Sequence, residues 1–177
     1  MRKLGIIAVL SLIVTALAAV PALAVAPTSV ESTGGLHVCQ DSALSVDKEL
    51  TFDESGTILQ SANLVGTGEV CGAGTGGTAT LTSTAVVTTG CINPGSKDQQ
   101  PRGLQRTTTT SSGTAELEIT RPGRGIFNVE TTEVGTAGRT CPGQQTPVLV
   151  SVTFTDIVLT ITSQTGTITA TFPDIDP

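Results

Sequence analysis

The sequence predicts an all-β protein, an antiparallel β-sandwich of roughly seven to nine strands with Greek-key-like connections, cross-linked by two disulfides. Three observations predict this class. Apolar residues alternate with threonine over several segments, turns rich in Gly, Pro and Asn separate those segments, and the chain carries four cysteines. No segment is a convincing amphipathic helix, although Leu44, Val46 and Leu50 could lie on one helical face. A β-barrel is the alternative, because alternation alone does not distinguish it from a sandwich.

The N-terminus has the pattern of a secretory signal peptide. Arg2 and Lys3 precede an uncharged, mainly apolar run over residues 4–20, and Ala22-Leu23-Ala24 follows. A membrane anchor is the alternative, but a run of about 17 residues is at the lower limit for spanning a bilayer. No basic cluster follows that run to stop translocation. We therefore expect cleavage after Ala24, a secreted, extracellular product, and no membrane association afterwards.

After cleavage, residues 25–35 are small and polar and predict a flexible leader, and residues 36–177 predict a single β-sandwich domain. Loss of the two positive charges Arg2 and Lys3 takes the formal charge from −6 to −8. Such an acidic domain is a poor binder of nucleic acid or anionic lipid. The chain has no Trp or Tyr, so it lacks the rings on which sugars and single-stranded bases usually stack.

In the first half, the clearest strand is Thr78–Cys91. Ala79, Leu81, Ala85, Val87 and Cys91 fall on one parity, and threonines occupy the other, which predicts one buried and one wetted face. Weaker patterns predict strands at Leu36–Cys39, in the second part of 42–54, and at Ile58–Cys71. Gly66 and Gly68 within the last of these predict a bulge or bend.

In the second half, Asp156 interrupts a strand whose apolar residues resume on the shifted parity, which predicts a β-bulge. The remaining segments follow the same reasoning from alternation and turn residues. We expect a loop at 92–105, a strand at 107–120, a turn at 121–125, a returning strand at 126–134, a loop at 135–147, the bulged strand at 148–161, a turn at 163–166 and a last strand at 168–172.

The four cysteines, Cys39, Cys71, Cys91 and Cys141, predict two disulfides, because an even count in an exported chain is typical of a disulfide framework. Three pairings are open. We favour Cys39–Cys71 with Cys91–Cys141. The two middle cysteines flank the long strand and so lie at its opposite ends, and Cys91 and Cys141 both open turn-rich segments. The spacings do not fit the close pairs of a zinc site, so no metal is expected.

No set of residues predicts an active site, so we expect a non-enzymatic protein without a cofactor. His37 is the only histidine, and a strand position beside a disulfide is its simplest interpretation. Glu116 and Glu118 share the wetted parity of a strand. A calcium site from Asp41, Asp47, Asp53 or Asp156 is a minor alternative, since no loop has the calcium-binding spacing. The glycine-rich stretch 71–77 lacks the lysine of a phosphate loop.

The C-terminal two-thirds resembles small exported β proteins of high-GC Gram-positive bacteria. The resemblance covers roughly residues 64–172 and rests on Cys91-x-Asn-Pro-Gly, a polar Pro/Gln loop, Cys141-Pro and the run Val152-Thr-Phe-Thr-Asp-Ile-Val-Leu-Thr-Ile-Thr. It implies secretion, a β architecture and the Cys91–Cys141 pairing. It implies no activity and no functional residue.

Two functions are therefore expected from the sequence. The first is a secreted, non-catalytic binding or structural β-domain, whose partner is an unidentified protein or a component of the cell envelope. The alternative is an extracellular protease inhibitor that uses the loop after Cys91, with Arg102 filling a basic-specific pocket. In both cases the candidate interaction residues are Asn93, Lys97 and Arg102.

Overall fold

The computed structural model describes residues 24–93 and 100–176. All of its strand pairings are antiparallel. The strands are β1 (Ser29–Gly34), β2 (His37–Val38), β3 (Ser45–Phe52), β4 (Leu59–Cys71), β5 (Gly77–Ile92), β6 (Arg102–Glu116), β7 (Glu118–Arg121), β8 (Arg124–Glu130), β9 (Val134–Gly135), β10 (Thr146–Ser163) and β11 (Gly166–Phe172).

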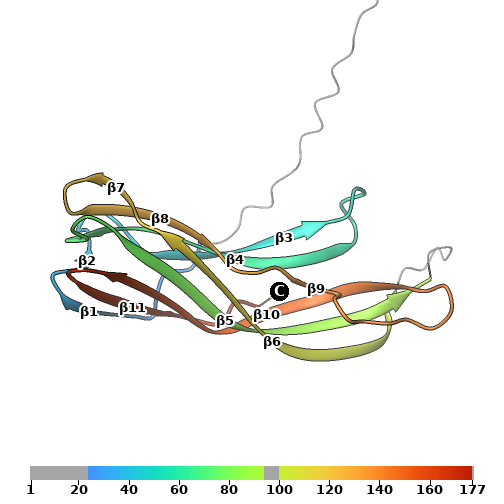
Figure 1. Ribbon diagram of the computed structural model, residues 1–177. Helices are drawn as coiled ribbons and strands as arrows, with labels where there is room; N and C mark the ends of the chain where they lie inside the picture. Colours follow the sequence, from blue (N-terminus) through green and yellow to red (C-terminus); the bar gives the residue numbers. More distant parts are fainter. Residues whose placement is uncertain (1–23, 94–99, 177) are drawn as a thin grey trace, which may run out of the picture.

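The strands form two sheets that pack face to face, which confirms the predicted antiparallel β-sandwich (Figure 1). One sheet has the order β1-β11-β10-β5-β6. We call it the threonine sheet, because threonines cover the outer face of its central strands. The other is built around β4, which pairs with β2 and β3 along one side and with β8 and β9 along the other. Strand β7 pairs with the far side of β8. We call this second sheet the β4 sheet.

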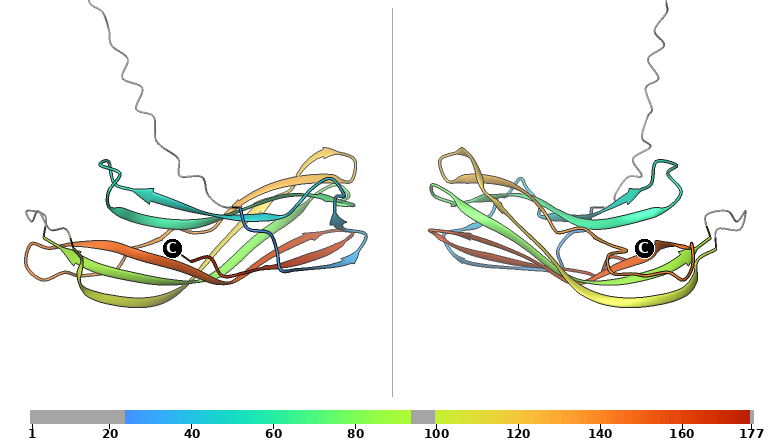
Figure 2. Two further views of the ribbon diagram at one scale, coloured as in Figure 1. Left: turned by 180° about the vertical axis from the view of Figure 1, so that it is seen from behind. Right: turned by 45° about the vertical axis from the view of Figure 1, so that its right-hand side comes forward.

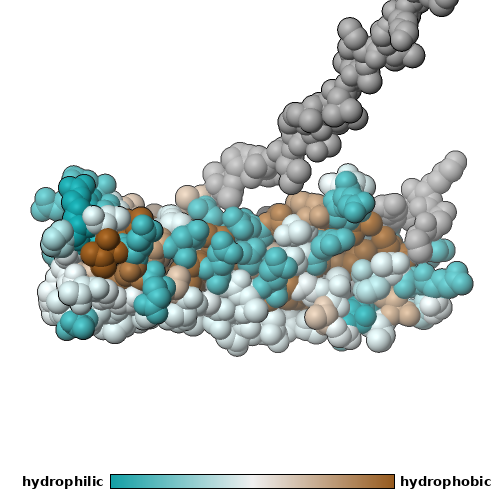
Figure 3. All heavy atoms as spheres, turned by 45° about the horizontal axis from the view of Figure 1, so that its top comes forward, coloured by the Kyte–Doolittle hydropathy of each residue, from teal (hydrophilic) through white to brown (hydrophobic). Residues whose placement is uncertain are grey.

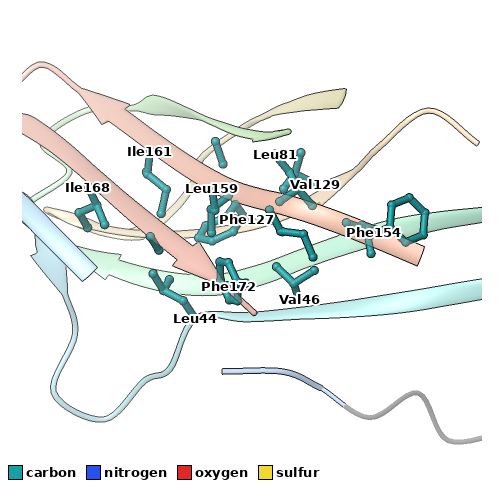
Figure 4. Close-up of a cluster of buried hydrophobic side chains, with 14 of the residues drawn as sticks. Leu44, Val46, Leu81, Phe127, Val129, Phe154, Leu159, Ile161, Ile168 and Phe172 are labelled. Carbon is teal, nitrogen blue, oxygen red and sulfur yellow. The ribbon is translucent and has the colours of Figure 1, made fainter. Parts of the chain in front are cut away.

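The long strands β4, β5 and β10 run along an elongated body, as the two views of Figure 2 show. Their inward side chains fill the space between the sheets (Figure 4). The parity predicted for β5 is confirmed, since Ala79, Leu81, Ala85 and Val87 are buried. Several large side chains of the core are fully buried. They are Leu36, Leu64, Leu81, Phe154, Ile157, Leu159, Ile161 and Ile168.

The predicted bulge at Asp156 is also confirmed. The pairing of β10 with β5 shifts between Thr155 and Val158, and Asp156 has a φ of 51°. Aspartate tolerates this left-handed conformation better than most residues. The extra residue restores the inward parity, so Phe154 and Ile157 on either side of it are both buried.

Gly66 and Gly68 do not mark a bulge, which corrects that part of the prediction for β4. The pairing of β4 with β8 runs without a shift from Val65 to Cys71. Both glycines instead make room for neighbouring side chains. A Cβ atom on Gly68 would lie 2.6 Å from Cδ2 of Leu44 and 3.0 Å from Cζ of Phe127, and one on Gly66 would lie 3.1 Å from Cγ1 of Val129. Glycine in a strand interior often marks such a close approach.

The predicted flexible leader, residues 25–35, is corrected by strand β1, which pairs with β11 from Ser29 to Gly34. All six residues of β1 are exposed. Edge pairing relies on backbone hydrogen bonds and needs no apolar side chain, so the composition gave no signal for it. The predicted signal peptide falls on residues outside the described part, apart from Ala24. Among the described residues, no helix is long and apolar enough to cross a bilayer.

Two predicted boundaries in the middle of the chain are also wrong. Arg102–Gln105, predicted as loop, belongs to β6, where Arg102 lies opposite Cys91. The segment 107–120, predicted as one strand, divides at the buried Leu117. Before Leu117 the chain belongs to the threonine sheet, and after it to the β4 sheet as β7. The alternation continues through the crossing, because both sheets bury one face against the same core.

Candidate functional site

Both favoured disulfides are confirmed. Cys39–Cys71, with a Cα–Cα distance of 5.1 Å, joins the chain after β2 to the end of β4. Cys91–Cys141, at 5.8 Å, ties the loop between β9 and β10 to the end of β5. The two bonds lie at opposite ends of the elongated body. The second bond therefore fixes the frame around the candidate interaction residues.

At that end of the molecule the two sheets diverge, and we call it the open end (Figures 1 and 2). Strand β3 shows the change along its own length. Val46 is fully buried, whereas Leu50, on the same face of the strand, is 42 % exposed. Phe52 is 41 % exposed. Large apolar side chains thus remain in contact with water where the opposite sheet no longer covers them.

A hollow of about 180 Å³ lies at the open end. Both sheets contribute to it: the turn before β4 provides one wall, and the ends of β5 and β10 provide the other. Its lining residues are Thr57, Ile58, Ile92, Pro101 and Val148. Figure 3 shows apolar surface at this right-hand end of the molecule.

Pro101 also belongs to an apolar cluster beside the hollow. A Cβ atom on Gly90 would lie 2.7 Å from Cβ of Pro101, 3.1 Å from Cδ2 of Leu104 and 3.4 Å from Cγ2 of Val150. These three side chains therefore gather over Gly90. Leu104 is 61 % exposed and Val150 is 39 % exposed. We call the hollow and this cluster together the apolar patch.

The apolar patch is bordered by positive charge. Arg102 and Arg106 lie on β6 and are exposed. Arg139, in the loop that Cys141 anchors, donates from Nη2 to the carbonyl oxygen of Gly103 (2.5 Å) and from Nη1 to Oε1 of Gln105 (2.7 Å). Within β6, Glu116 at the far end is the single acidic residue. The open end of β6 is therefore locally basic in a protein whose net charge is −6.

The candidate interaction residues separate as follows. Asn93 and Arg102 both lie at the open end and are exposed, whereas Lys97 falls outside the described residues. Sequence reasoning missed Leu104, Val150 and Arg139. Leu104 gave a readable signal, because it is an isolated large apolar residue in a polar stretch. Arg139 gave none, since its place depends on a disulfide and a long loop.

The other residues weighed for chemistry lie apart. Nδ1 of His37 is 3.0 Å from the carbonyl oxygen of Gly35, and the ring is exposed on edge strand β2. Glu116 and Glu118 are exposed on strands of different sheets. Across the described residues, no three His, Cys, Asp or Glu side chains gather closely enough to hold a metal ion.

Asp53, one of the carboxylates considered for calcium, has a structural role. Its Oδ1 accepts hydrogen bonds from the backbone N–H groups of Thr57 and Ile58, both at 3.0 Å, and Ser55 donates to the same carboxylate. The backbone N–H of Ile58, followed by the Ser55 hydroxyl, lowers the pKa of Asp53. These bonds shape the turn between β3 and β4 that forms one wall of the hollow.

Lys48 holds the C-terminal segment near the open end. Its Nζ donates to the carbonyl oxygen of Asp176 (2.6 Å), and Phe154 pairs with Ile175 through two backbone hydrogen bonds. Burial lowers the pKa of Lys48, and the negative charge of Asp176 opposes that shift. The last described residues thus lie between the two layers, where Figure 1 marks the C-terminus.

A second, open hollow of about 410 Å³ lies at the opposite end. It is polar, and its lining residues are Thr75, Gly76, Gly77, Thr78, Glu116, Thr162, Ser163 and Gln164. Part of the glycine-rich stretch 71–77 therefore forms its wall. The stretch connects two strands rather than a strand and a helix, so it lacks the helix N-terminus that binds phosphate.

Comparison of the chain with protein-family models, with curated proteins and with solved structures found no match.

Proposed function

We propose that this protein is an exported, non-catalytic binding module that contacts a protein partner with the apolar patch at its open end. The observation that carries the proposal is the exposed cluster of Leu104, Val150 and Pro101 beside an apolar hollow. Binding interfaces typically combine an apolar centre with a polar rim that includes arginine. The rim here is Arg102, Arg106 and Arg139.

The frame around the patch supports the same function. Cys91–Cys141 and the two hydrogen bonds of Arg139 hold the loop between β9 and β10 against β6. A surface fixed before binding loses less conformational entropy in the complex. The signal peptide expected from Arg2, Lys3 and the apolar run would bring the domain to the oxidising compartment in which these disulfides form.

The test uses capture from cell-envelope and culture fractions by the immobilised protein, with matched variants. Leu104→Asp places a charge on the patch, and Val30→Asp does the same at an exposed apolar position (44 %) on edge strand β1. We expect a protein that is retained by the unmodified chain and by Val30→Asp, and lost with Leu104→Asp. Circular dichroism checks that both variants are folded. Equal capture by both variants would exclude the patch.

The alternative, a protease inhibitor, gains no support from the described residues. Arg102 lies in the β5–β6 ladder opposite Cys91, whereas an inhibitor presents its specificity residue on an exposed loop. Residual trypsin activity after incubation with an equimolar amount of the protein tests it. Under the proposed function we expect full activity.

A further inference from the structure

Strand β6 has an open hydrogen-bonding edge. The carbonyl oxygen of Ser112 accepts a hydrogen bond from the N–H of Thr132, so the backbone groups of Ser112 point away from β5. Backbone direction alternates along a strand, so the groups of Thr110, Thr108 and Arg106 point the same way. Beyond the contact of Arg139 with Gly103, the described residues provide no backbone partner for this edge between Leu104 and Thr110.

Strand β3 has a second open edge. Val46 exchanges two backbone hydrogen bonds with Val25, at 2.9 and 3.1 Å, on the side away from β4. By the same alternation, the backbone groups of Lys48 and Leu50 point to that side. No further backbone partner for them is found among the described residues.

The β6 edge lacks the usual protection against pairing. Natural edge strands are typically short, bulged, or interrupted by proline or inward-pointing charge. From Leu104 to Thr110, β6 contains no proline and one charge, Arg106, and its pairing with β5 is regular from Gln105 to Glu116. Such an edge is a template for another strand.

The two edges are complementary in charge and lie on opposite sides of the molecule. Arg102, Arg106 and Arg139 surround the β6 edge. Asp47, Glu49, Asp53 and Glu54 surround the β3 edge, with Lys48 as the only positive charge there. Strand β6 lies beneath the β8 side of the β4 sheet, through the contacts of Ser111 and Ser112 with Thr132, whereas β3 is on the other side of β4.

We propose that the β6 edge of one copy pairs with the β3 edge of a second copy, head to tail. Two β6 edges would bring arginines together, which disfavours a symmetric pair. In a parallel ladder, a residue whose backbone groups point to the partner strand lies beside one whose groups point away. Arg106 then lies beside Glu49 on the outer face, and Thr107 covers the exposed Leu50 on the inner face. Because each copy keeps one free edge of each kind, the contact propagates into chains.

The decisive experiment is sedimentation velocity of the full mature protein with two charge reversals, Arg106→Glu and Glu49→Arg. For the unmodified protein we expect a weight-average mass that rises with concentration up to about 1 mM, because edge contacts are small and weak. Each single variant should be monomeric, since each brings like charges together at every contact. An equimolar mixture should associate again into chains, because the unmodified β3 of Arg106→Glu matches the unmodified β6 of Glu49→Arg, and the two reversed positions carry opposite charges that match each other.

Matched controls are Arg121→Glu and Glu118→Arg, which reverse exposed charges on β7 and should leave the association unchanged. Thr108→Pro removes an N–H that points outward from β6, and it should weaken association at least tenfold while the β5 pairing persists. An unmodified protein that stays monomeric over the whole range, or a mixture of the two variants that stays monomeric, would overturn the proposal. A strictly monomeric protein could still bind a partner through the apolar patch, so this failure is distinct from failure of the proposed function.

Discussion

The two ends of the sandwich use the same residue types in different ways. At the closed end, which carries Cys39–Cys71, backbones approach so closely at several positions that glycine is required there. A Cβ atom on Gly166 would lie 1.9 Å from the carbonyl oxygen of Thr33, and one on Gly72 would lie 2.1 Å from that of Gly35. At the open end and in the loop that Cys141 anchors, a Cβ atom on Gly56 or Gly143 would meet nothing within 4 Å.

Burial follows the same division. Inward apolar residues near the closed end and the middle, such as Ile161 and Ile168, are fully buried, while Leu50, on the inward face of β3 at the open end, is exposed. The comparison shows that alternation determines which face of a strand a side chain occupies. Whether an opposite sheet then covers that face is decided by the three-dimensional course of the strands. This is why the packed region supplies stability and the open end is available for contacts.

The largest expected difference is between two phenylalanines. Phe154 is fully buried in the core, and Phe52 is 41 % exposed near the open end. We expect Phe154→Ala to lower the free energy of unfolding by about 3–5 kcal/mol, because it leaves a cavity in a packed core. Phe52→Ala should cost about 1 kcal/mol or less. Urea unfolding followed by circular dichroism measures both. Equal losses would show that the open end is packed after all.

Removal of each disulfide gives the next comparison between the two ends. Their sequence separations are 32 and 50 residues. The chain-entropy model gives about 4 kcal/mol for each, so replacing either cysteine pair with alanines should have a similar effect on unfolding. The local effects should differ. Loss of Cys91–Cys141 should accelerate amide hydrogen exchange in the loop 136–145, and loss of Cys39–Cys71 should leave that loop unchanged.

Two glycine substitutions distinguish destabilisation by a steric collision from destabilisation by an unfavourable backbone conformation. Gly166→Ala should lower the free energy of unfolding by about 3 kcal/mol, because its Cβ collides with the backbone of β1. Gly143→Ala meets no neighbour and has a φ of 63°, so only the left-handed conformation disfavours alanine, by about 1 kcal/mol. Thermal unfolding of the two variants would contradict this view if Gly143→Ala were the more damaging.

The smallest expected effect is pH-dependent. Arg124 donates to both carboxylate oxygens of Glu69, with Nη2–Oε2 at 2.8 Å, and this bonding holds the pKa of Glu69 below its ordinary value. A lowered folded-state pKa stabilises the fold above the unfolded-state pKa, and the gain is lost as pH falls through the folded-state value. Glu69→Gln should therefore lower the Tm at neutral pH and match the unmodified protein in strong acid. A constant difference across that range would assign the effect to packing instead.

Much of the fold could be predicted from the sequence. Alternation in β5, the parity change at Asp156 and the cysteine spacing each reflect local geometry or chain connectivity, and each was confirmed. Strand β1 and the sheet crossing at Leu117 could not be predicted, because both depend on which backbone lies alongside. The apolar patch could be predicted from the sequence only in part. Asn93 and Arg102 lie at the same end as the apolar patch, but the divergence of the sheets that exposes Leu50 leaves no mark in the local pattern.

The single inserted residue at Asp156 also has a consequence for how this chain tolerates change in length. Strand β10 spans 18 residues, and its inward side chains have even numbers directly before Asp156 (Val152 and Phe154) and odd numbers after it (Ile157, Leu159 and Ile161). Removing Asp156 would turn every side chain of one half to the wrong side, whereas a compensating insertion nearby would set it right again. The pairing of β10 with β5 shifts a second time between Leu149 and Ser151, so the longest strand of the molecule consists of three segments in successive phases, joined at Val150 and Asp156.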